Sequence, residues 1–180
     1  MSVGSNHDDC TIIHHSCKGT IMEKIVTHLW FDDTAEEAMA FYTSIFKNSR
    51  IVSVFKGKAP MPDGSIGELV YGIFELEGRT FFALNGGPMF KFTPAISLYV
   101  NCDTQEEIDE LWNKLLAGGG KPMDCGWLED KFGLAWQIVP SVLERLTDLS
   151  DPDRSMRVMQ SLMGMTKIDL VALERAYDGK

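Results

Sequence analysis

The order strand, helix and then strands occurs twice along this chain, and this repeat limits the possible folds more than any other feature. The first copy begins near Lys24 and the second near Ala95, which gives a repeat of about 70 residues. One such unit leaves a hydrophobic face of its sheet uncovered, so we expect two units to pair and to leave a cleft between them. The sequence therefore predicts an α+β fold built from two tandem β-α-β-β-β modules.

Short runs of β-branched and aromatic residues indicate the strands of the first copy. We expect these strands at Lys24–Asp33, Arg50–Phe55, Glu68–Glu77 and Arg79–Leu84. Apolar residues spaced three and four apart predict a helix over Ala35–Phe46, and Thr34 with Glu37 would form a capping box at its start. Residues 57–64 are rich in glycine and proline, which indicates a loop.

The second copy repeats these signals. A strand is expected over Ala95–Asn101, and Thr104 with Glu107 would form a second capping box before a helix that Gly118–Gly120 end. The remaining strands are expected at Lys121–Leu128, as one or two strands, and at Leu134–Val139. The two copies thus share the same order of elements.

After Pro140 the pattern changes to helices only. They are expected at Ser141–Leu149, Pro152–Met163 and Ile168–Tyr177, where they would cap the sheet or form a subunit contact. The predicted organisation is a leader that is either disordered or added by cloning, two modules and a C-terminal helical extension, at 1–21, 22–88, 89–140 and 141–180. Residues 22–180 would form one folded domain.

The stretch DKFGLAWQIVP, Asp130–Pro140, combines a turn, a strand and a stop. Along this strand Trp136 and Ile138 share one side, whereas Gln137 lies on the other. A polar side chain in the middle of a strand needs partners or a wet cavity, so Gln137 is a candidate site residue. Its alternative role is to tie two strands together.

Composition excludes several classes of function. The 180 residues carry a formal net charge of −9, which argues against a nucleic-acid partner because such binding needs a basic surface. No apolar run approaches the roughly 18 residues of a spanning helix, so no membrane partner is expected. The four cysteines show no disulfide framework, and the cytoplasm is the expected location.

A zinc knuckle in the leader would use Cys10, His14, His15 and Cys17 as ligands. Their spacing is less regular than that of structural zinc sites, which argues against it.

Four segments together resemble the PhnB-like branch of the vicinal-oxygen-chelate superfamily, which includes glyoxalase I, bleomycin-resistance proteins and extradiol dioxygenases. They are LWFDDTAEEAMAFYTSIF (Leu29–Phe46), FFALNGGP (Phe81–Pro88), ISLYVNCDTQEEIDELW (Ile96–Trp112) and DKFGLAWQIVP (Asp130–Pro140). The resemblance runs from about Met22 to Lys180 and implies the glyoxalase/bleomycin-resistance/dihydroxybiphenyl-dioxygenase-like fold. It also implies a homodimer, either side by side or with modules exchanged.

Catalytic members of this superfamily hold a divalent metal through four side chains on the first and last strand of each module. The resemblance places these positions at or beside His28, near Phe81, near Ala95 and at Gln137. Phenylalanine and alanine cannot ligate a metal, so no metal is expected. If a metal is present, His28 and Gln137 would hold it, and an unusual geometry could add Glu68 or Glu75.

The leading hypothesis is a protein that binds a small organic molecule in an aromatic-lined cleft between the modules, without a metal and with no assigned reaction. His28 would act as a base or hydrogen-bond donor and Gln137 as an orienting amide. The cleft would be lined by aromatic side chains, namely Trp30, Tyr71, Phe82, Tyr99 and Trp136. Aromatic residues in sheets also form cores, and a histidine on an apolar strand can be a hydrogen-bonded core residue.

Two alternatives remain open: a metal-dependent lyase, isomerase or dioxygenase, and a non-catalytic sequestering protein of the bleomycin-resistance type. Sequences of this branch also carry the label 3-demethylubiquinone-9 3-methyltransferase. A methyltransferase of the usual kind binds its cofactor at a glycine-rich turn from strand to helix, whereas Gly118–Gly120 follow a helix. Methyl transfer is therefore not expected.

Overall fold

The computed structural model describes residues 24–60 and 64–180 of the chain. It divides into two compact units, Met1–Gly87 and Pro88–Lys180, and each is described here by itself. The leader, with Cys10 and Cys17, lies outside the described residues. The prediction that residues 22–180 form one folded domain stays a prediction.

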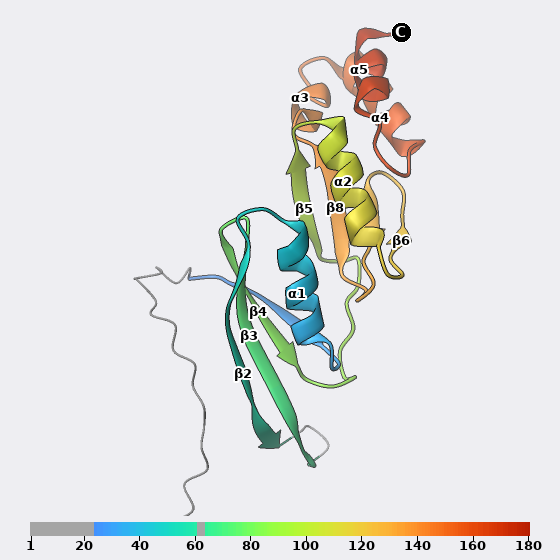
Figure 1. Cartoon of the computed structure of the whole chain (residues 1–180). Coiled ribbons are helices and arrows are strands. Elements are labelled where there is room, and N and C mark those ends of the chain that lie inside the picture. Colours follow the sequence, from blue (N-terminus) through green and yellow to red (C-terminus); the bar gives the residue numbers. More distant parts are fainter. Residues whose placement is uncertain (1–23, 61–63) are drawn as a thin grey trace, which may run out of the picture. The chain divides into compact units, whose positions relative to one another are not determined.

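The first unit is a four-stranded sheet with one helix. Its elements are β1 (Thr27–Phe31), α1 (Ala35–Ile45), β2 (Arg50–Pro60), β3 (Ile66–Leu76) and β4 (Arg79–Asn85). The strand order is β1-β4-β3-β2, in which β1 runs parallel to β4 and the other neighbours are antiparallel. Helix α1 lies along one face of this sheet (Figure 1).

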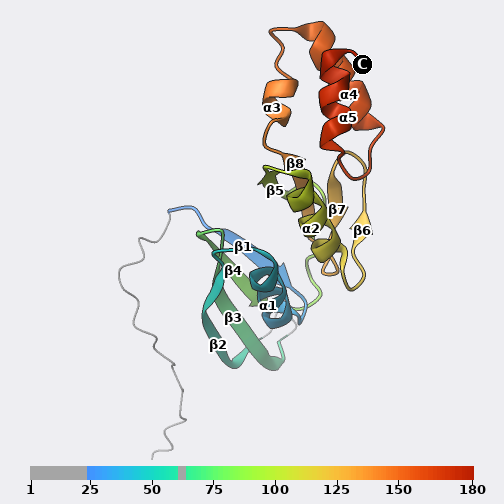
Figure 2. The ribbon, with the colours of Figure 1, turned by 45° about the horizontal axis from the view of Figure 1, so that its top comes forward.

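The second unit repeats this arrangement. Its sheet and crossover helix comprise β5 (Ser97–Cys102), α2 (Gln105–Leu116), β6 (Lys121–Pro122), β7 (Trp127–Glu129) and β8 (Ala135–Pro140). The strand order is β5-β8-β7-β6, and β5 is parallel to β8. Figure 2 shows α2 packed against this sheet. The α+β architecture with two β-α-β-β-β modules is therefore confirmed.

Helix α1 defines which side of the first sheet is core. A Cβ atom added at Gly72 would overlap the Met39 side chain of α1, so the backbone of β3 and this helix approach closely there. The strand positions on this side are buried: Phe74 and Ala83 are fully inaccessible, and Phe81 is 7% exposed. Residues of the opposite parity on β1, β3 and β4 form the other face, which we call the first open face.

The strands differ from the predicted ranges mainly at β2. We expected a loop from residue 57, but the strand continues to Pro60 because it pairs with β3 as far as Pro60 opposite Ile66. Strand β2 is the edge of the sheet, so a proline at its end removes no donor that the sheet needs. Strand β1 is shorter than Lys24–Asp33. The predicted turn at Glu77-Gly78 is confirmed, with both residues at positive φ.

The two helix starts are capped differently. The second capping box is present: Thr104 accepts a hydrogen bond from the Glu107 N–H, and the Glu107 carboxylate accepts one from the Asp103 N–H. The first is absent, since the Thr34 side chain makes no capping bond. Instead the Ala35 N–H donates to Asn85 Oδ1 at 2.7 Å. A residue 50 positions away, at the end of β4, therefore caps α1.

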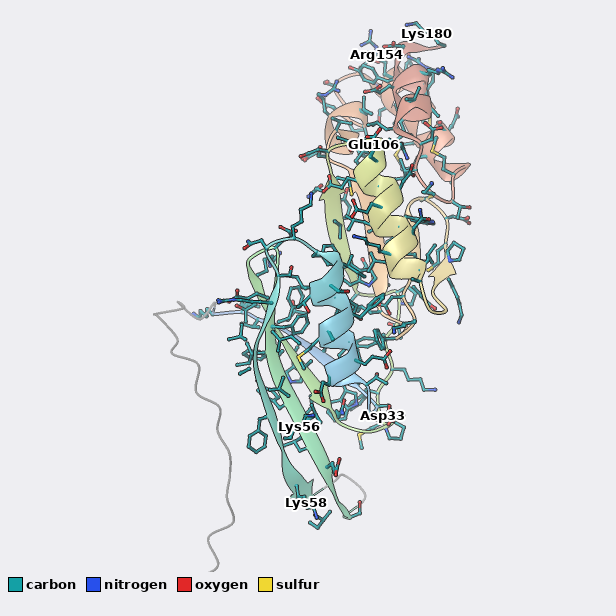
Figure 3. The ribbon with its side chains drawn as sticks, in the orientation of Figure 1. Asp33, Lys56, Lys58, Glu106, Arg154 and Lys180 are labelled. Atoms are coloured by element: carbon teal, nitrogen blue, oxygen red, sulfur yellow. The ribbon has the colours of Figure 1, made fainter. Side chains whose placement is uncertain are left out.

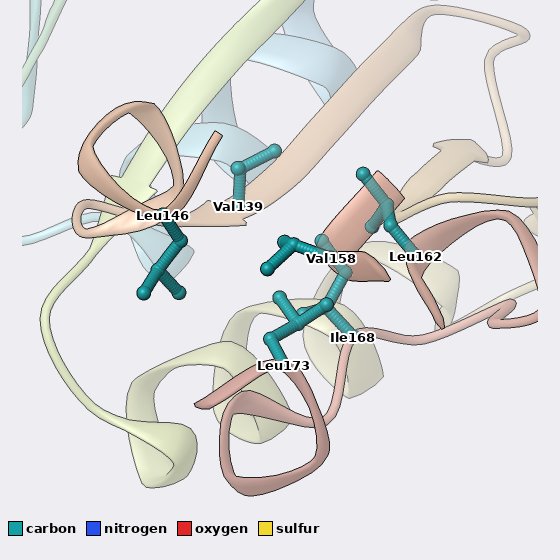
Figure 4. Packing of buried hydrophobic residues seen from close by; sticks show 6 residues of the cluster. All are labelled: Val139, Leu146, Val158, Leu162, Ile168 and Leu173. Carbon is teal, nitrogen blue, oxygen red and sulfur yellow. The ribbon is translucent and has the colours of Figure 1, made fainter. Parts of the chain in front are cut away.

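The C-terminal extension forms three helices, α3 (Leu143–Leu146), α4 (Pro152–Met163) and α5 (Leu170–Asp178). They share one apolar cluster with the end of β8, formed by Val139, Leu146, Val158, Leu162, Ile168 and Leu173 (Figure 4). Gln105 of α2 secures the start of α5, because its Nε2 donates to the Ile168 carbonyl and its Oε1 accepts from the Leu170 N–H. The Lys167–Asp109 ion pair at 2.6 Å adds a second tie. The extension is thus part of the second unit.

Asn85 offers a direct test of the observed cap. In Asn85→Ala, α1 loses its bond at Ala35, and the Asp33 carbonyl loses the bond from Asn85 Nδ2. We expect the free energy of unfolding to fall by about 1–2 kcal/mol, measured by urea denaturation. Thr34→Ala is the matched control and should change it by less than about 0.5 kcal/mol, since that hydroxyl makes no capping bond. Equal losses in both variants would contradict the assignment.

Candidate functional site

The first open face carries an aromatic group around His28. His28 and Phe82 are register partners on β1 and β4, and Tyr71 comes from β3. The His28 ring centroid lies 6.1 Å from that of Tyr71 and 6.3 Å from that of Phe82, and the latter two are 5.7 Å apart. His28 itself is exposed, whereas the two flanking rings are partly buried. Three predicted site residues are therefore brought together, with a titratable ring at the surface of an aromatic patch.

Trp30 lies on the same side of β1 as His28, but its polar group is already used. Its indole N–H donates to the Gly87 carbonyl at 2.9 Å. A Cβ atom at Gly86 would overlap the indole ring, so the ring lies directly against the backbone there. Trp30 borders the aromatic group, and it also holds the loop after β4 through its contacts with Gly86 and Gly87.

The two glutamates considered as extra metal ligands do not join His28 as free donors. Glu75 lies on the side of Tyr71, but its carboxylate pairs with Arg50, which holds the Glu75 pKa below its usual value. Glu68 shares its side of β3 with Gly72, which faces α1. Neither residue completes a donor set around the imidazole.

The second unit has a corresponding open face on the side of its sheet away from α2. Gln137 on β8 is the register partner of Tyr99 on β5 and of Trp127 on β7, so these three side chains form one row across the sheet. Gln137 Nε2 donates to Ser97 Oγ at 2.8 Å, which ties β8 to β5. Tyr99 is 52% exposed. Sequence reasoning selected Gln137 and Tyr99 for this face but did not select Ser97.

Trp136 is not on this face. Its register partner is Leu98, on the opposite side of the sheet from Tyr99, and it is 2% exposed. Its indole N–H donates to Asp130 Oδ2 at 2.8 Å, while Asp130 Oδ1 accepts from the N–H groups of Phe132 and Leu134. Trp136 and Asp130 thus hold the turn before β8 in the core. The alternation along DKFGLAWQIVP already separated Trp136 from Gln137.

The C-terminal extension reaches the second open face. Val139 shares the Gln137 side of β8, and it packs in the apolar cluster of the extension. Burial, with a further contribution from the Glu144 carboxylate of α3, raises the pKa of Tyr99. Glu144 therefore acts electrostatically on this face, although it lies in a segment that carried no site prediction.

The donor set does not fit the metal centre of the superfamily. Within residues 24–60 and 64–180, no group of three or more histidine, cysteine, aspartate or glutamate side chains could hold a metal ion. The strand neighbour of His28 is Phe82 and that of Gln137 is Tyr99, so each pair of strands offers one superfamily-type donor at most. Ala95 lies before β5, and Phe81 faces the core.

Comparison with known proteins gives the family. The model of the 3-demethylubiquinone-9 3-methyltransferase family matches residues 23–139. The chain belongs to this family. No curated protein matches the sequence.

Solved structures agree with this family and its fold. A PhnB protein from Bacillus cereus, described as a putative 3-demethylubiquinone-9 3-methyltransferase, is 38% identical over 66% of this chain and all of its own, with a TM-score of 0.58. A protein from Pseudomonas aeruginosa is 19% identical over 64% of this chain and 95% of its own, with a TM-score of 0.51. The fosfomycin resistance protein FosX from Listeria monocytogenes is 17% identical over 70% of this chain and 97% of its own, with a TM-score of 0.49. The PhnB protein thus supports a PhnB-like fold for this chain.

The family match is shorter than the sequence resemblance suggested. We expected it to continue to Lys180, but it ends at residue 139, one residue before the end of β8. Helices α3 to α5 therefore lie beyond the matched family domain.

Cys102 provides a test of the core of the second unit. Its side chain is inaccessible, and burial, together with the carboxylates of Glu107 and Asp103, raises its pKa to about 12. The thiol therefore stays protonated below that pH, and we expect no alkylation of Cys102 by iodoacetamide in the folded protein at about pH 8. Peptide mass spectrometry with and without denaturant measures this. Modification of folded Cys102 as fast as of the denatured form would contradict the expected burial.

Proposed function

We propose that the protein binds a small, largely apolar organic molecule on the aromatic surface around His28, without a metal ion. The observation that carries this proposal is the group of His28, Tyr71 and Phe82, in which an exposed imidazole stands beside two partly buried rings. Such a surface combines apolar contact area with two groups, the His28 imidazole and the Tyr71 phenol, that can donate or accept a hydrogen bond. The cleft between the two modules remains part of the prediction from the repeat.

His28 would act as a base or hydrogen-bond donor toward the bound molecule, because its exposed imidazole has one nitrogen that can accept and one that can donate. Gln137, on the second open face, would orient a polar group of a ligand through its amide. The reaction is unassigned. Binding without turnover would make the protein a sequestering one, as in the bleomycin-resistance type, and turnover would make it an enzyme.

Methyl transfer does not form part of the proposal, although the family carries that name. Cofactor sites of the usual methyltransferase kind use a glycine-rich turn between a strand and the following helix. In this chain the turns from β1 to α1 and from β5 to α2 contain Asp32, Asp33 and Thr34, and Asp103 and Thr104. Neither turn contains a glycine.

Location and assembly complete the proposal. None of the helices in the described ranges has the length and hydropathy that a membrane span requires. Cys102 and Cys125 are free thiols, which suits the cytoplasm, where thiols stay reduced. The exposed apolar side chains of α4, Met156, Met159 and Met163, recur at helical spacing and suit a contact between two copies of the chain.

A binding experiment with paired variants tests the site. Neutral aromatic compounds would be screened by thermal shift, and the dissociation constant of the best compound would be measured by protein NMR. We expect Phe82→Leu to weaken binding about two- to ten-fold, since it removes a ring from the cluster. His28→Ala should weaken it as well. Phe90→Leu is the matched control, because Phe90 is 59% exposed and lies outside the sheet, and it should change nothing.

Two outcomes would overturn the proposal. Binding that is unaffected by both Phe82→Leu and His28→Ala would place the ligand elsewhere. Near-stoichiometric divalent metal in the purified protein, measured by elemental analysis and lost in His28→Ala, would favour the metal-dependent lyase, isomerase or dioxygenase instead.

The homodimer has its own test. Light scattering during size-exclusion chromatography should give twice the chain mass of 20.1 kDa. Met159→Glu on the exposed side of α4 should shift the mass toward the monomer, because it adds a charge to an apolar contact. A monomeric wild-type protein would exclude the dimer, and a dimer that survives the substitution would exclude α4 as its contact.

A further inference from the structure

We propose that the second open face contains a subsite for an organic ammonium group, formed by Tyr99, Trp127, Gln137 and Glu144. The proposal rests on the proposed function and names a class of ligand for it: an apolar or aromatic body that carries a protonated amine. It also gives the C-terminal extension a role in selecting the ligand.

The row across the sheet provides the frame. Trp127 and Tyr99 are register partners of Gln137 from its two sides, so the amide stands between an indole and a phenol. Neighbouring strands are about 4.8 Å apart, which places the two aromatic residues about 10 Å apart at the backbone. That spacing leaves room for one small group above the amide. Backbone pairing over three strands fixes this row.

The two rings are available to a ligand. Tyr99 is half exposed and Trp127 is partly exposed. Among the described residues neither ring contacts another aromatic ring, and neither the phenol nor the indole N–H has a hydrogen-bond partner. Aromatic faces attract cations, and tryptophan and tyrosine do so more strongly than other side chains.

The polar groups of this face include acceptor oxygens that an ammonium group can use. Gln137 uses its Nε2 group on Ser97, which leaves Oε1 as an acceptor. The phenol oxygen of Tyr99 can also accept. An ammonium with N–H groups can satisfy both while its charge lies against the rings.

The carboxylate that acts on Tyr99 has the sign that a cation needs. Glu144 is exposed on α3, and its carboxylate contributes to the raised pKa of Tyr99, which is why we place it beside the row. Glu129 is on the same side of β7 and pairs with Lys121 at a distance of 3.9 Å. Arg145, next to Glu144, is also exposed. Because Glu129 pairs with Lys121, Glu144 is the carboxylate of this face that would attract an ammonium group.

The test compares two probes of equal shape on the full-length protein, 2-phenylethylammonium and 2-phenylethanol. Their dissociation constants would be measured by NMR titration of the ¹⁵N-labelled protein at low ionic strength. We expect the ammonium probe to bind about five-fold more tightly and to shift the amide signals of residues 97–99, 127 and 137. The preference should weaken as salt is added.

The variants separate charge from shape. Glu144→Gln keeps the exposed side chain but removes the charge, and it should reduce the preference to less than about two-fold. Glu106→Gln is the matched control, since Glu106 is exposed on α2 (labelled in Figure 3), on the opposite side of this sheet. It should leave the preference unchanged. Tyr99→Leu should lower the affinity for the ammonium probe more than that for the alcohol.

The outcomes distinguish the two proposals. Equal affinities for both probes, or a preference that survives Glu144→Gln, would overturn the ammonium subsite. If 2-phenylethanol still binds and its binding falls in Phe82→Leu, the proposed function stands without the subsite. If the ammonium preference is present and depends on Glu144 but Phe82→Leu affects neither probe, the subsite stands and the role of the first open face fails.

Discussion

The parallel pairing of the first and last strands in each unit is the interaction on which the rest of this structure depends. It aligns His28 with Phe82 in one unit and Tyr99 with Gln137 in the other, across 54 and 38 positions of sequence. A parallel pair requires a crossover, and the single crossover helix covers one face of its sheet. The other face remains open. The candidate site residues are the polar and aromatic side chains that this geometry leaves on the open faces.

Much of the fold follows from local patterns in the sequence. The repeat, the hairpin at Glu77-Gly78 and the capping box at Thr104 depend on residues close to one another along the chain, and these predictions were confirmed. The cap on α1 could not be predicted in this way, because its acceptor is Asn85 at the far end of the same unit. The true end of β2 likewise depends on its partner strand and not on its own prolines.

The site was predicted only in part, for the same reason. Alternation along a strand identifies which side a residue takes, and it correctly separates Trp136 from Gln137, although both were chosen as site residues. Which residues meet across strands is decided by register. The register sets Trp127 of β7 opposite Gln137, which the sequence of β7 alone does not determine. Glu144 lies on a short helix beyond the family domain, where no motif indicates a site.

The contacts of Trp30 bear on how the tandem repeat could have arisen by gene duplication. Its indole binds the carbonyl of Gly87, the last residue of the first unit, and its ring lies against Gly86. Asn85, just before them, is bonded to both Asp33 and Ala35 near the start of the same unit. Hydrogen bonds within the first unit therefore hold its C-terminal end against residues near its N-terminal end. A unit whose two ends are bonded to each other can be duplicated in tandem with all of its own contacts intact. The second unit has the same order of strands and helix, as such a duplication would produce.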